Sequence, residues 1–242
     1  MLIPRPSLCR YFGITIILFL IFLVCRLPRL IHSHLYDLSY ESYFQRQFQV
    51  YVLTTSCDRF TIDVATYFES GSLILVPNHS DEPKCDAVDR EQLHLQLEEH
   101  SRSKDDLFRE KYAQVLDSCA QGSRAKCLIL EDDIIFLHNP KRTREILVEN
   151  TLPLFNDGEI DAFDCTKRGF GWLPSTHTGM GSQCRVYSKH SATCLSQCLR
   201  EQRGSSQLDV GLANCQVRCG LKQKRFLLVV HGGLSSTMDR VE

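Results

Sequence analysis

The sequence predicts an α/β fold, with a mostly parallel sheet flanked by helices. Three observations predict it: short β-rich runs, a helical pattern between two of them, and a group of carboxylates at the end of a strand. With 242 residues, 43% of them hydrophobic, the chain is long enough for one substantial domain and an appendage. The predicted organisation is a short tail 1–10, a transmembrane anchor 11–27, a stem 28–48 and a folded body 49–242.

The anchor prediction rests on Tyr11–Cys25, an uncharged apolar run with arginines on both sides. A helix of this length spans about 22 Å, short against a hydrocarbon core of about 30 Å and closer to the thinner early secretory membranes. A cleaved signal peptide is the alternative, but residues 26–34 offer no small-residue cleavage site.

Cysteine content predicts the compartment of the body. Ten of the twelve cysteines follow the anchor, an even number and a density unusual for cytosolic chains. Asn78–Ser80 adds a glycosylation sequon in a loop rich in Pro and Asp. We therefore expect a single-pass type II protein of the Golgi or endoplasmic reticulum membrane, with a lumenal body.

The body begins with two β-rich runs, residues 49–55 and 73–77. A Ser-x-x-Asp capping box at Ser103 then opens a helix whose apolar residues recur at helical spacing until Gly122. The strand 127–130 follows directly. Such alternation is typical of sheets that bind ligands at the carboxyl ends of their strands.

The second half of the body is less regular in sequence. Residues 151–181 are rich in Gly, Pro and aromatics, and we expect an irregular connection in which Trp172 either shapes a pocket wall or fills the core. Helices are predicted over 190–203 and 208–220, and a last strand over 225–230.

Each of the two C-terminal helices carries a Cys-x3-Cys pair, which places both thiols on one helix face. In an antiparallel hairpin this spacing favours two bridges, Cys194 to Cys219 and Cys198 to Cys215, each contributing about 2 to 4 kcal/mol. Four thiolates could instead hold Zn²⁺, but an oxidising lumen favours disulfides.

Three consecutive carboxylates, Glu131, Asp132 and Asp133, interrupt an otherwise apolar strand. Because an unpaired buried charge costs several kcal/mol or more, we expect them where the strand opens into a cleft, holding Mn²⁺ or Mg²⁺. Side chains alternate along a strand, so Glu131 and Asp133 are expected on one face and Asp132 on the other. The alternative is an acidic turn between two strands, neutralised by nearby Arg or Lys.

His231 ends the last predicted strand, at the same edge of the sheet as the carboxylates. Carboxylates and a histidine at this edge suit a cation that shares its other positions with water and a diphosphate. Such a cation neutralises the charge on a departing nucleoside diphosphate, so we predict a glycosyltransferase that uses a nucleotide sugar. A histidine that merely caps the strand is the alternative. The formal net charge of −1 argues against a nucleic-acid partner.

Several motifs appear in the order in which a known family carries them. They are Val50–Thr55 with Asp58 and Arg59, Glu110–Tyr112 with Leu116–Cys119, Leu130–Asp133, Leu208–Leu212, and Val230–Ser236. In these motifs and the anchor, the chain resembles the post-GPI attachment to proteins factor 4 family, GPI N-acetylgalactosamine transferases among the GT-A glycosyltransferases. The resemblance covers the anchor and most of 50–237, and it implies a GT-A-like fold, a UDP-sugar donor and a glycan or glycolipid acceptor.

The resemblance also implies roles for individual residues. The metal contacts would be Glu131, Asp133 and His231, and the nucleotide contacts would be Thr54, Arg59 and Asp132. Asp209 lies where the family has an acidic residue before its final helix, a position suited to the general base of an inverting transfer. Asp209 fits a helix cap equally well, because Ser206-Gln-Leu-Asp209 is itself a capping box.

One segment departs from the family pattern. Where the family carries a transmembrane hairpin, residues 148–179 of this chain are mostly polar. The acceptor therefore stays open among a GPI glycan, another glycolipid and a protein-linked glycan. Two other classes remain as alternatives: an interaction protein stapled by disulfides, like the small chaperones of the mitochondrial intermembrane space, and a non-catalytic relative that only binds a sugar nucleotide. The length of the chain disfavours the first, since those chaperones are little more than the hairpin.

Overall fold

The computed structural model describes residues 40–54, 63–68, 73–76, 91–93, 104–166, 182–202 and 208–231. The chain divides into two units, 1–43 and 44–242, and the second holds all the strands and helices discussed below. In the described ranges, no helix combines the length and the hydropathy needed to cross a bilayer. The predicted anchor lies outside these ranges, so it stays a prediction.

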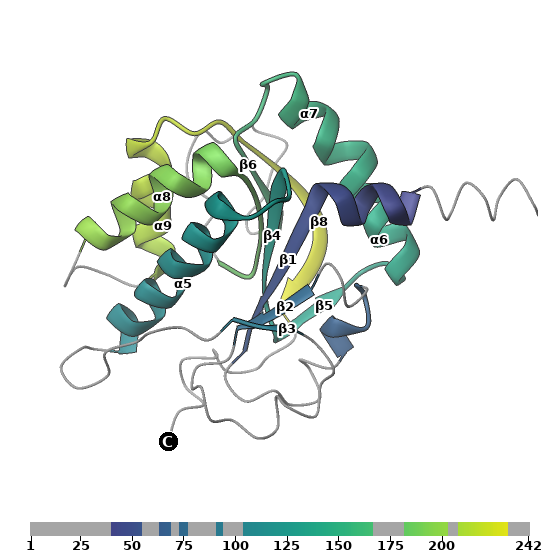
Figure 1. Ribbon diagram of the computed structural model, residues 1–242, viewed down its shortest axis with the longest axis horizontal. Helices are drawn as coiled ribbons and strands as arrows, with labels where there is room; N and C mark the ends of the chain where they lie inside the picture. The colour runs from purple at the N-terminus through teal and green to yellow at the C-terminus, as the bar shows by residue number, and fades with distance from the viewer. Residues whose placement is uncertain are drawn as a thin grey trace, which may run out of the picture. The chain divides into compact units, whose positions relative to one another are not determined.

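An eight-stranded mixed sheet forms the centre of the second unit (Figure 1). Its order is β3-β2-β1-β4-β7-β6-β8-β5. The bounds are β1 Phe48–Leu53, β2 Leu73–Val76, β3 Glu91–Gln92, β4 Lys126–Glu131, β5 Ile134–Phe136, β6 Ala162–Thr166, β7 Cys184–Ser188 and β8 Gln223–His231. The pairs β3–β2, β2–β1, β1–β4 and β6–β8 are parallel, while β4–β7, β7–β6 and β8–β5 are antiparallel. Parallel pairs are thus the majority, as the sequence predicts.

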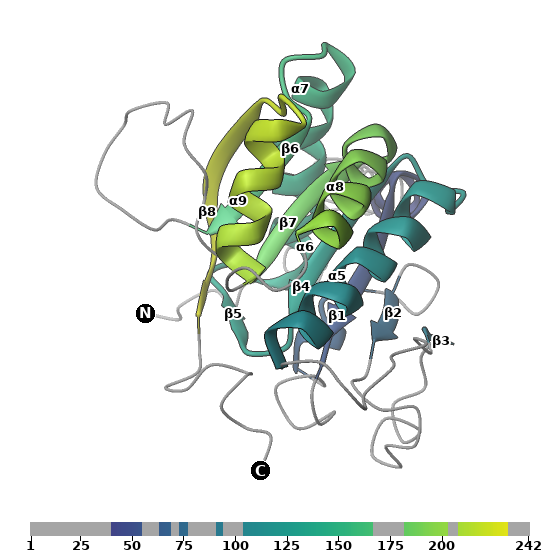
Figure 2. The same cartoon turned by 90° about the vertical axis from the view of Figure 1, so that its left-hand side faces the viewer.

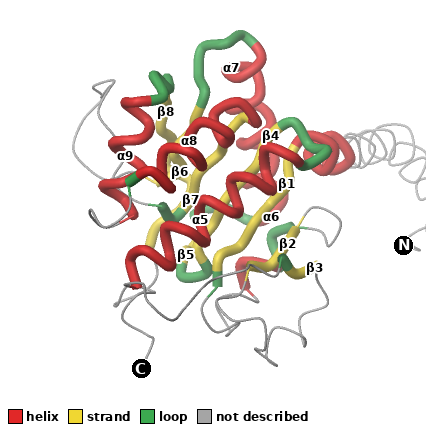
Figure 3. The backbone as a smooth tube through the Cα atoms, turned by 60° about the vertical axis from the view of Figure 1, so that its left-hand side comes forward, coloured by secondary structure: helices red, strands yellow, loops and turns green. Residues whose placement is uncertain are grey.

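Helices cover both faces of this sheet (Figures 1 and 2). On one face, α5 (Lys104–Gln121) packs against α8 (Lys189–Glu201), and α9 (Leu208–Arg218) lies beside both. On the other face lie α6 (Pro140–Ile146) and α7 (Leu152–Asn156), joined by the π-helical turn Leu147–Thr151. Figure 3 shows α5, α8 and α9 as one layer along the strands. The predicted α/β class is confirmed.

The core explains why the central strands β1 and β4 are buried at all but one position each. The helical spacing predicted for α5 is confirmed, since Tyr112, Val115, Leu116 and Cys119 are buried against the sheet. An aromatic cluster packs on the opposite face of the sheet from α5. Its stacked and edge-on pairs involve Phe44, Phe48, Tyr67, Phe68 and Phe136. A sheet covered on both faces needs apolar residues at consecutive strand positions, as β1 and β4 have.

The acidic run does not continue the strand. β4 ends at Glu131, and Asp132 and Asp133 form a turn that leads directly into β5. The predicted alternation of the three side chains across the sheet is therefore wrong, because it assumed a strand through all three positions. The backbone is the acidic turn between two strands that the alternative described, but this turn is buried.

Residues 151–181 are not irregular throughout, as the sequence analysis expected. The segment 152–166 forms α7 and β6, while Trp172 lies outside the described residues. β7 and α6 were also not anticipated. Both β6 and β7 contain charged residues within five-residue strands, so neither shows a recognisable apolar pattern. Helix α6 does carry local signals, because the Asn139 side chain accepts a hydrogen bond from the Arg142 amide and Pro140 occupies the first helical turn.

Both bridges predicted for the C-terminal helices are present. Cys194 is bonded to Cys219 and Cys198 to Cys215, with Cα atoms 6.1 and 5.6 Å apart. These four thiols are therefore not a zinc site. A further disulfide, Cys119 to Cys127, joins the end of α5 to the start of β4. The left-handed Gly220 (φ 64°) then closes α9 and turns the chain towards β8.

Candidate functional site

The carboxyl ends of β1 and β4 meet at the acidic turn. The parallel register places Leu53 beside Glu131, so the next residues of the two strands, Thr54 and Asp132, also meet. The Thr54 hydroxyl donates to Asp132 Oδ2 at 2.7 Å, and the Asp132 amide donates to the Leu53 carbonyl at 3.1 Å. These bonds fix the turn to the end of β1, and both side chains are buried.

A lysine from the helix layer reaches the same place. Lys111 lies on the sheet-facing side of α5, is 1% exposed, and donates from Nζ to the Thr54 carbonyl at 2.9 Å. Lysine is almost never this buried without a partner that compensates its charge. Its ammonium therefore brings a positive charge to the strand end that carries the carboxylates. The sequence analysis quoted Lys111 only within the motif Glu110–Tyr112 and assigned it no role, because the segment has the pattern of an ordinary amphipathic helix.

Glu131 is held by the segment that precedes β7. Its amide donates to the Gln183 carbonyl at 2.9 Å, and the Ser182 hydroxyl donates to its carboxylate. Burial raises the pKa of Glu131 to about 8, helped by the negative charges of Asp133, Asp209 and Asp132 and opposed by the hydrogen bond from Ser182. Ser182 directly follows the segment 151–181 that was expected to be irregular, and the sequence analysis assigned it no role.

Asp209 acts on this site through its charge. It lies in the first turn of α9, and its charge contributes to the raised pKa of Glu131. The fold thus brings together the two acidic positions that the sequence analysis singled out independently. Ser206, the first residue of the alternative capping box, lies outside the described residues.

The remaining predicted site residues are only partly placed. His231 is the last residue of β8, and its backbone pairs with Ile134, the residue that follows Asp133. The strand end that carries His231 therefore lies next to the acidic turn, while its side chain is outside the described residues, as is Arg59.

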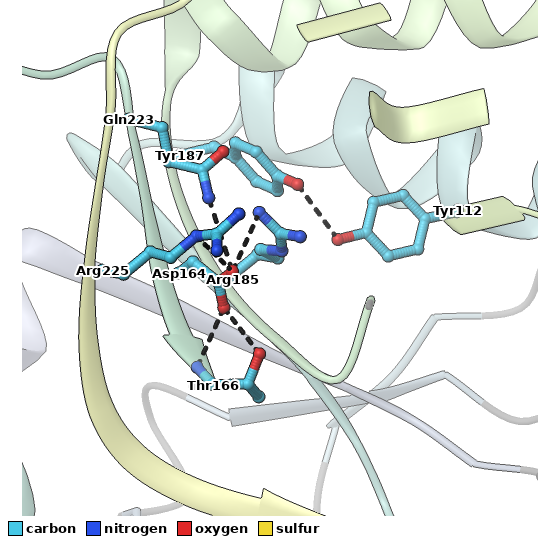
Figure 4. A network of polar contacts seen from close by, with 7 residues as sticks. All are labelled: Tyr112, Asp164, Thr166, Arg185, Tyr187, Gln223 and Arg225. Atoms are coloured by element: carbon cyan, nitrogen blue, oxygen red, sulfur yellow. Dashed lines mark hydrogen bonds and ion pairs between the residues drawn. The ribbon is translucent and has the colours of Figure 1, made fainter. Parts of the chain in front are cut away.

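A largely buried polar network joins the strands β6, β7 and β8 to α5 (Figure 4). Its members come from α5, β6, β7 and β8; they are Tyr112, Asp164, Thr166, Arg185, Tyr187, Gln223 and Arg225. Asp164 accepts from the Thr166 amide at 2.8 Å and its hydroxyl at 2.7 Å, and it forms an ion pair with Arg185 at 3.7 Å.

The network connects to the site through Arg185. This guanidinium is fully buried, and its pKa is raised despite the opposing effect of burial, mainly by the charge of Asp164, with Asp209 contributing. The Tyr112 and Tyr187 hydroxyls lie 3.4 Å apart beside it and link α5 to β7. Arg185 therefore supplies a permanent positive charge within the sheet, and the charge of Asp209 acts on it. The sequence analysis missed this network, because Asp164 and Arg185 lie on β6 and β7, whose sequences show no apolar pattern.

The donor chemistry of the turn fits a hard divalent cation. Glu131, Asp132 and Asp133 supply oxygen atoms. A cation would relieve the repulsion between their charges, which adds to the larger effect of burial on the pKa of Glu131. Within the described ranges, no three His, Cys, Asp or Glu side chains are arranged as a metal-binding group. The predicted ligand set includes His231, whose side chain is outside those ranges.

Replacing Glu131 with Gln is expected to remove a pH dependence from the stability of the chelator-treated protein. The pKa of Glu131 is about 8 in the folded protein and 4.5 ordinarily. Between pH 4.5 and 8, the folded state therefore keeps a proton that the unfolded state releases. The stabilisation from Glu131 is full below pH 4.5 and is lost as the pH rises through 8, by about 1.4 kcal/mol per pH unit.

Urea unfolding of wild type and Glu131→Gln at pH 5, 6, 7 and 8 measures this effect. The free energy of unfolding of wild type should fall relative to that of the variant as the pH rises. Glu201→Gln is the matched control, because this glutamate is 57% exposed, and it should follow wild type. Parallel curves for wild type and Glu131→Gln would contradict the buried position of the Glu131 carboxyl.

Comparisons with known proteins give no family and three examples of a distant likeness. No family model matches the chain, and no curated protein matches it in sequence. A Bacillus anthracis protein described as a glucose-1-phosphate thymidylyltransferase is similar in structure, with a TM-score of 0.47, 9% identity, and coverage of 80% of this chain and 93% of that one.

Two further solved structures show a comparable likeness. A glycosyltransferase involved in glycosylation of the major capsid of PBCV-1 has a TM-score of 0.46 and 12% identity, covering 79% of this chain and 96% of that one. A 4-diphosphocytidyl-2C-methyl-D-erythritol synthase has a TM-score of 0.42 and 11% identity, covering 76% and 89% respectively. A functional conclusion must therefore come from the residues of the site.

Proposed function

We propose that this chain is a metal-dependent glycosyltransferase that moves a sugar from a UDP-sugar to a glycan. One observation carries the proposal: three buried carboxylates lie where the carboxyl ends of β1 and β4 meet, and the charge of Asp209, in α9, contributes to the raised pKa of Glu131. Buried like charges are unfavourable unless a ligand or a cation uses them. Strand carboxyl ends are also where open α/β sheets bind their ligands.

The site residues would divide into those that bind the metal and the nucleotide and one that acts as the general base. Glu131, Asp133 and His231 would hold Mn²⁺ or Mg²⁺, which when bound supplies positive charge to the diphosphate of the donor. Asp132 and Thr54 would form the nucleotide side of the site, together with Arg59. The hydrogen bond between Thr54 and Asp132 favours this role, because it keeps the two side chains in one fixed arrangement.

Asp209 would be the general base. An inverting transfer requires a carboxylate that takes the proton from the acceptor hydroxyl as that oxygen attacks the sugar. Asp209 lies in the first turn of α9, and its charge acts on both Glu131 and Arg185.

The finer assignment follows the family resemblance. We propose a GT-A enzyme of the GPI N-acetylgalactosamine transferase type, held by residues 11–27 in the Golgi or endoplasmic reticulum membrane with its body 49–242 in the lumen. N-acetylgalactosamine is the leading donor sugar, and the acceptor is a GPI glycan or another lumenal glycan. The four C-terminal cysteines, all in disulfides, are consistent with an oxidising lumen.

A donor panel tests the function. The full chain in detergent is incubated with individual UDP-sugars and Mn²⁺, with GPI glycans, free glycolipids and protein-linked glycans as separate acceptors. We expect UDP release and a mass increase of one sugar on one acceptor class, both abolished by a chelator. Nucleotide binding without transfer to any acceptor would favour the non-catalytic relative, and the absence of binding to all donors would contradict the proposal.

A further inference from the structure

Two buried cysteines, Cys165 and Cys184, lie opposite each other in the middle of the sheet. The antiparallel register of β6 and β7 pairs Asp164 with Arg185, and Cys165 and Cys184 are the next residues along these two strands. Both residues are 0% exposed. Burial and then the hydrogen bond between the two thiols raise the pKa of the Cys184 thiol.

The backbone at this pair suits a covalent bond. Directly opposed residues of antiparallel strands have Cα atoms about 4.5 to 5.5 Å apart, and disulfides join Cα atoms about 4.4 to 6.8 Å apart. The other six cysteines of the described part already form disulfides, Cys119 to Cys127, Cys194 to Cys219 and Cys198 to Cys215. Only Cys165 and Cys184 are thiols among the residues described.

We propose that Cys165 and Cys184 are an oxidation site, at which a low-molecular-weight disulfide such as oxidised glutathione forms a further cross-strand disulfide. One cysteine thiolate attacks the oxidant and displaces one glutathione thiolate, leaving a mixed disulfide. The thiolate of the second cysteine then attacks the protein sulfur of that mixed disulfide and displaces the other glutathione. Two electrons pass to the oxidant, and the two thiol protons end on the two released glutathione thiols.

The timing of this reaction follows from burial. A thiol in apolar surroundings stays protonated, and the protonated thiol does not attack a disulfide. The two cysteines therefore react while β6 and β7 are still assembling, before the sheet is covered.

The bridge would act next to the acidic turn. Cys184 follows Ser182 and Gln183, which hold the Glu131 side chain and amide. A bond to Cys165 fixes the start of β7, and it thereby fixes the positions of Ser182 and Gln183 next to Glu131. The proposal concerns the covalent structure alone, so it stands whatever reaction the site performs.

Tryptic mapping of the full chain tests the proposal. Trypsin cuts after Arg144, Lys167, Arg168 and Arg185, which places the two cysteines in separate peptides, 145–167 and 169–185. The chain is reduced, refolded in detergent with a glutathione redox buffer, blocked with iodoacetamide and digested without reductant. Refolding continues until the peptides of the Cys194–Cys219 and Cys198–Cys215 bridges are linked, which shows that the sample is oxidised.

We expect peptide 145–167 to be joined to peptide 169–185, without alkyl groups, two hydrogens lighter than the sum of the two peptides and separable by reductant. Cys184→Ser is the matched control, in which Cys165 should carry one alkyl group. Alkylated Cys165 and Cys184 in a wild-type sample whose other bridges have formed would overturn the proposal. A bond from either cysteine to a different cysteine would overturn it too.

Discussion

Asp209→Asn is expected to lower turnover by about 10² to 10⁴ while leaving donor binding and the melting temperature nearly unchanged. Asparagine cannot take a proton at neutral pH, but it still accepts a hydrogen bond. The substitution therefore removes the function of a general base and keeps the function of a helix cap. If Asp209 only caps α9, the variant should turn over at nearly the wild-type rate and lose about 1 kcal/mol of stability or less.

The matched control for this variant is Asp105→Asn. Asp105 also lies in the first turn of a helix, α5, so the substitution removes the same favourable interaction with the helix dipole. Turnover of the control should equal that of wild type. Wild-type turnover in Asp209→Asn would instead remove Asp209 from the catalytic residues.

Much of the fold could be predicted where one pattern dominates a segment. β1 and β4 read as strands because both faces of the sheet are covered, which requires consecutive apolar residues. α5 and the C-terminal helices show clear helical spacing, and the four-residue spacing of their cysteines was sufficient to predict the bridges of Cys198 and Cys194. These features depend on local periodicity, which a single sequence displays directly.

Strands β6 and β7 could not be found in this way. Each carries a charged residue inside the sheet, Asp164 and Arg185, and these residues are stable there because they form an ion pair with each other. The pairing is a tertiary contact, so neither segment shows it alone.

The same reason limited the prediction of the site. The acidic turn was identified because carboxylates within an apolar run are unusual, and Asp209 because it lies where the family that the chain resembles has an acidic residue. Ser182 and Lys111 were missed because their importance lies in the contacts with Glu131 and Thr54 that the fold creates.

Asp133→Ala is expected to weaken Mn²⁺-dependent binding of UDP by at least about 10²-fold. Loss of a residue that only supports a metal ligand typically costs about 10- to 100-fold in metal affinity, so loss of a ligand should cost at least the upper value. Asp133 is fully buried, and its charge raises the pKa of Glu131, so removing it also relieves repulsion in the metal-free protein. The melting temperature of the metal-free variant should therefore equal or exceed that of wild type.

Asp157→Ala is the control, because it removes one carboxylate outside the acidic turn. Asp157 is exposed and lies at the end of α7. Asp157→Ala should bind UDP as wild type does. Because folding is checked separately by the melting temperature, weaker binding by Asp133→Ala can be assigned to the site.

Calorimetric titration of UDP into the full chain, with and without saturating Mn²⁺, tests the central claim most directly. We expect wild type and Asp157→Ala to bind UDP at least about 10²-fold more tightly with Mn²⁺, and Asp133→Ala to gain nothing from the metal. Equal UDP affinity in wild type and Asp133→Ala at saturating Mn²⁺ would contradict a metal-dependent nucleotide site at the acidic turn.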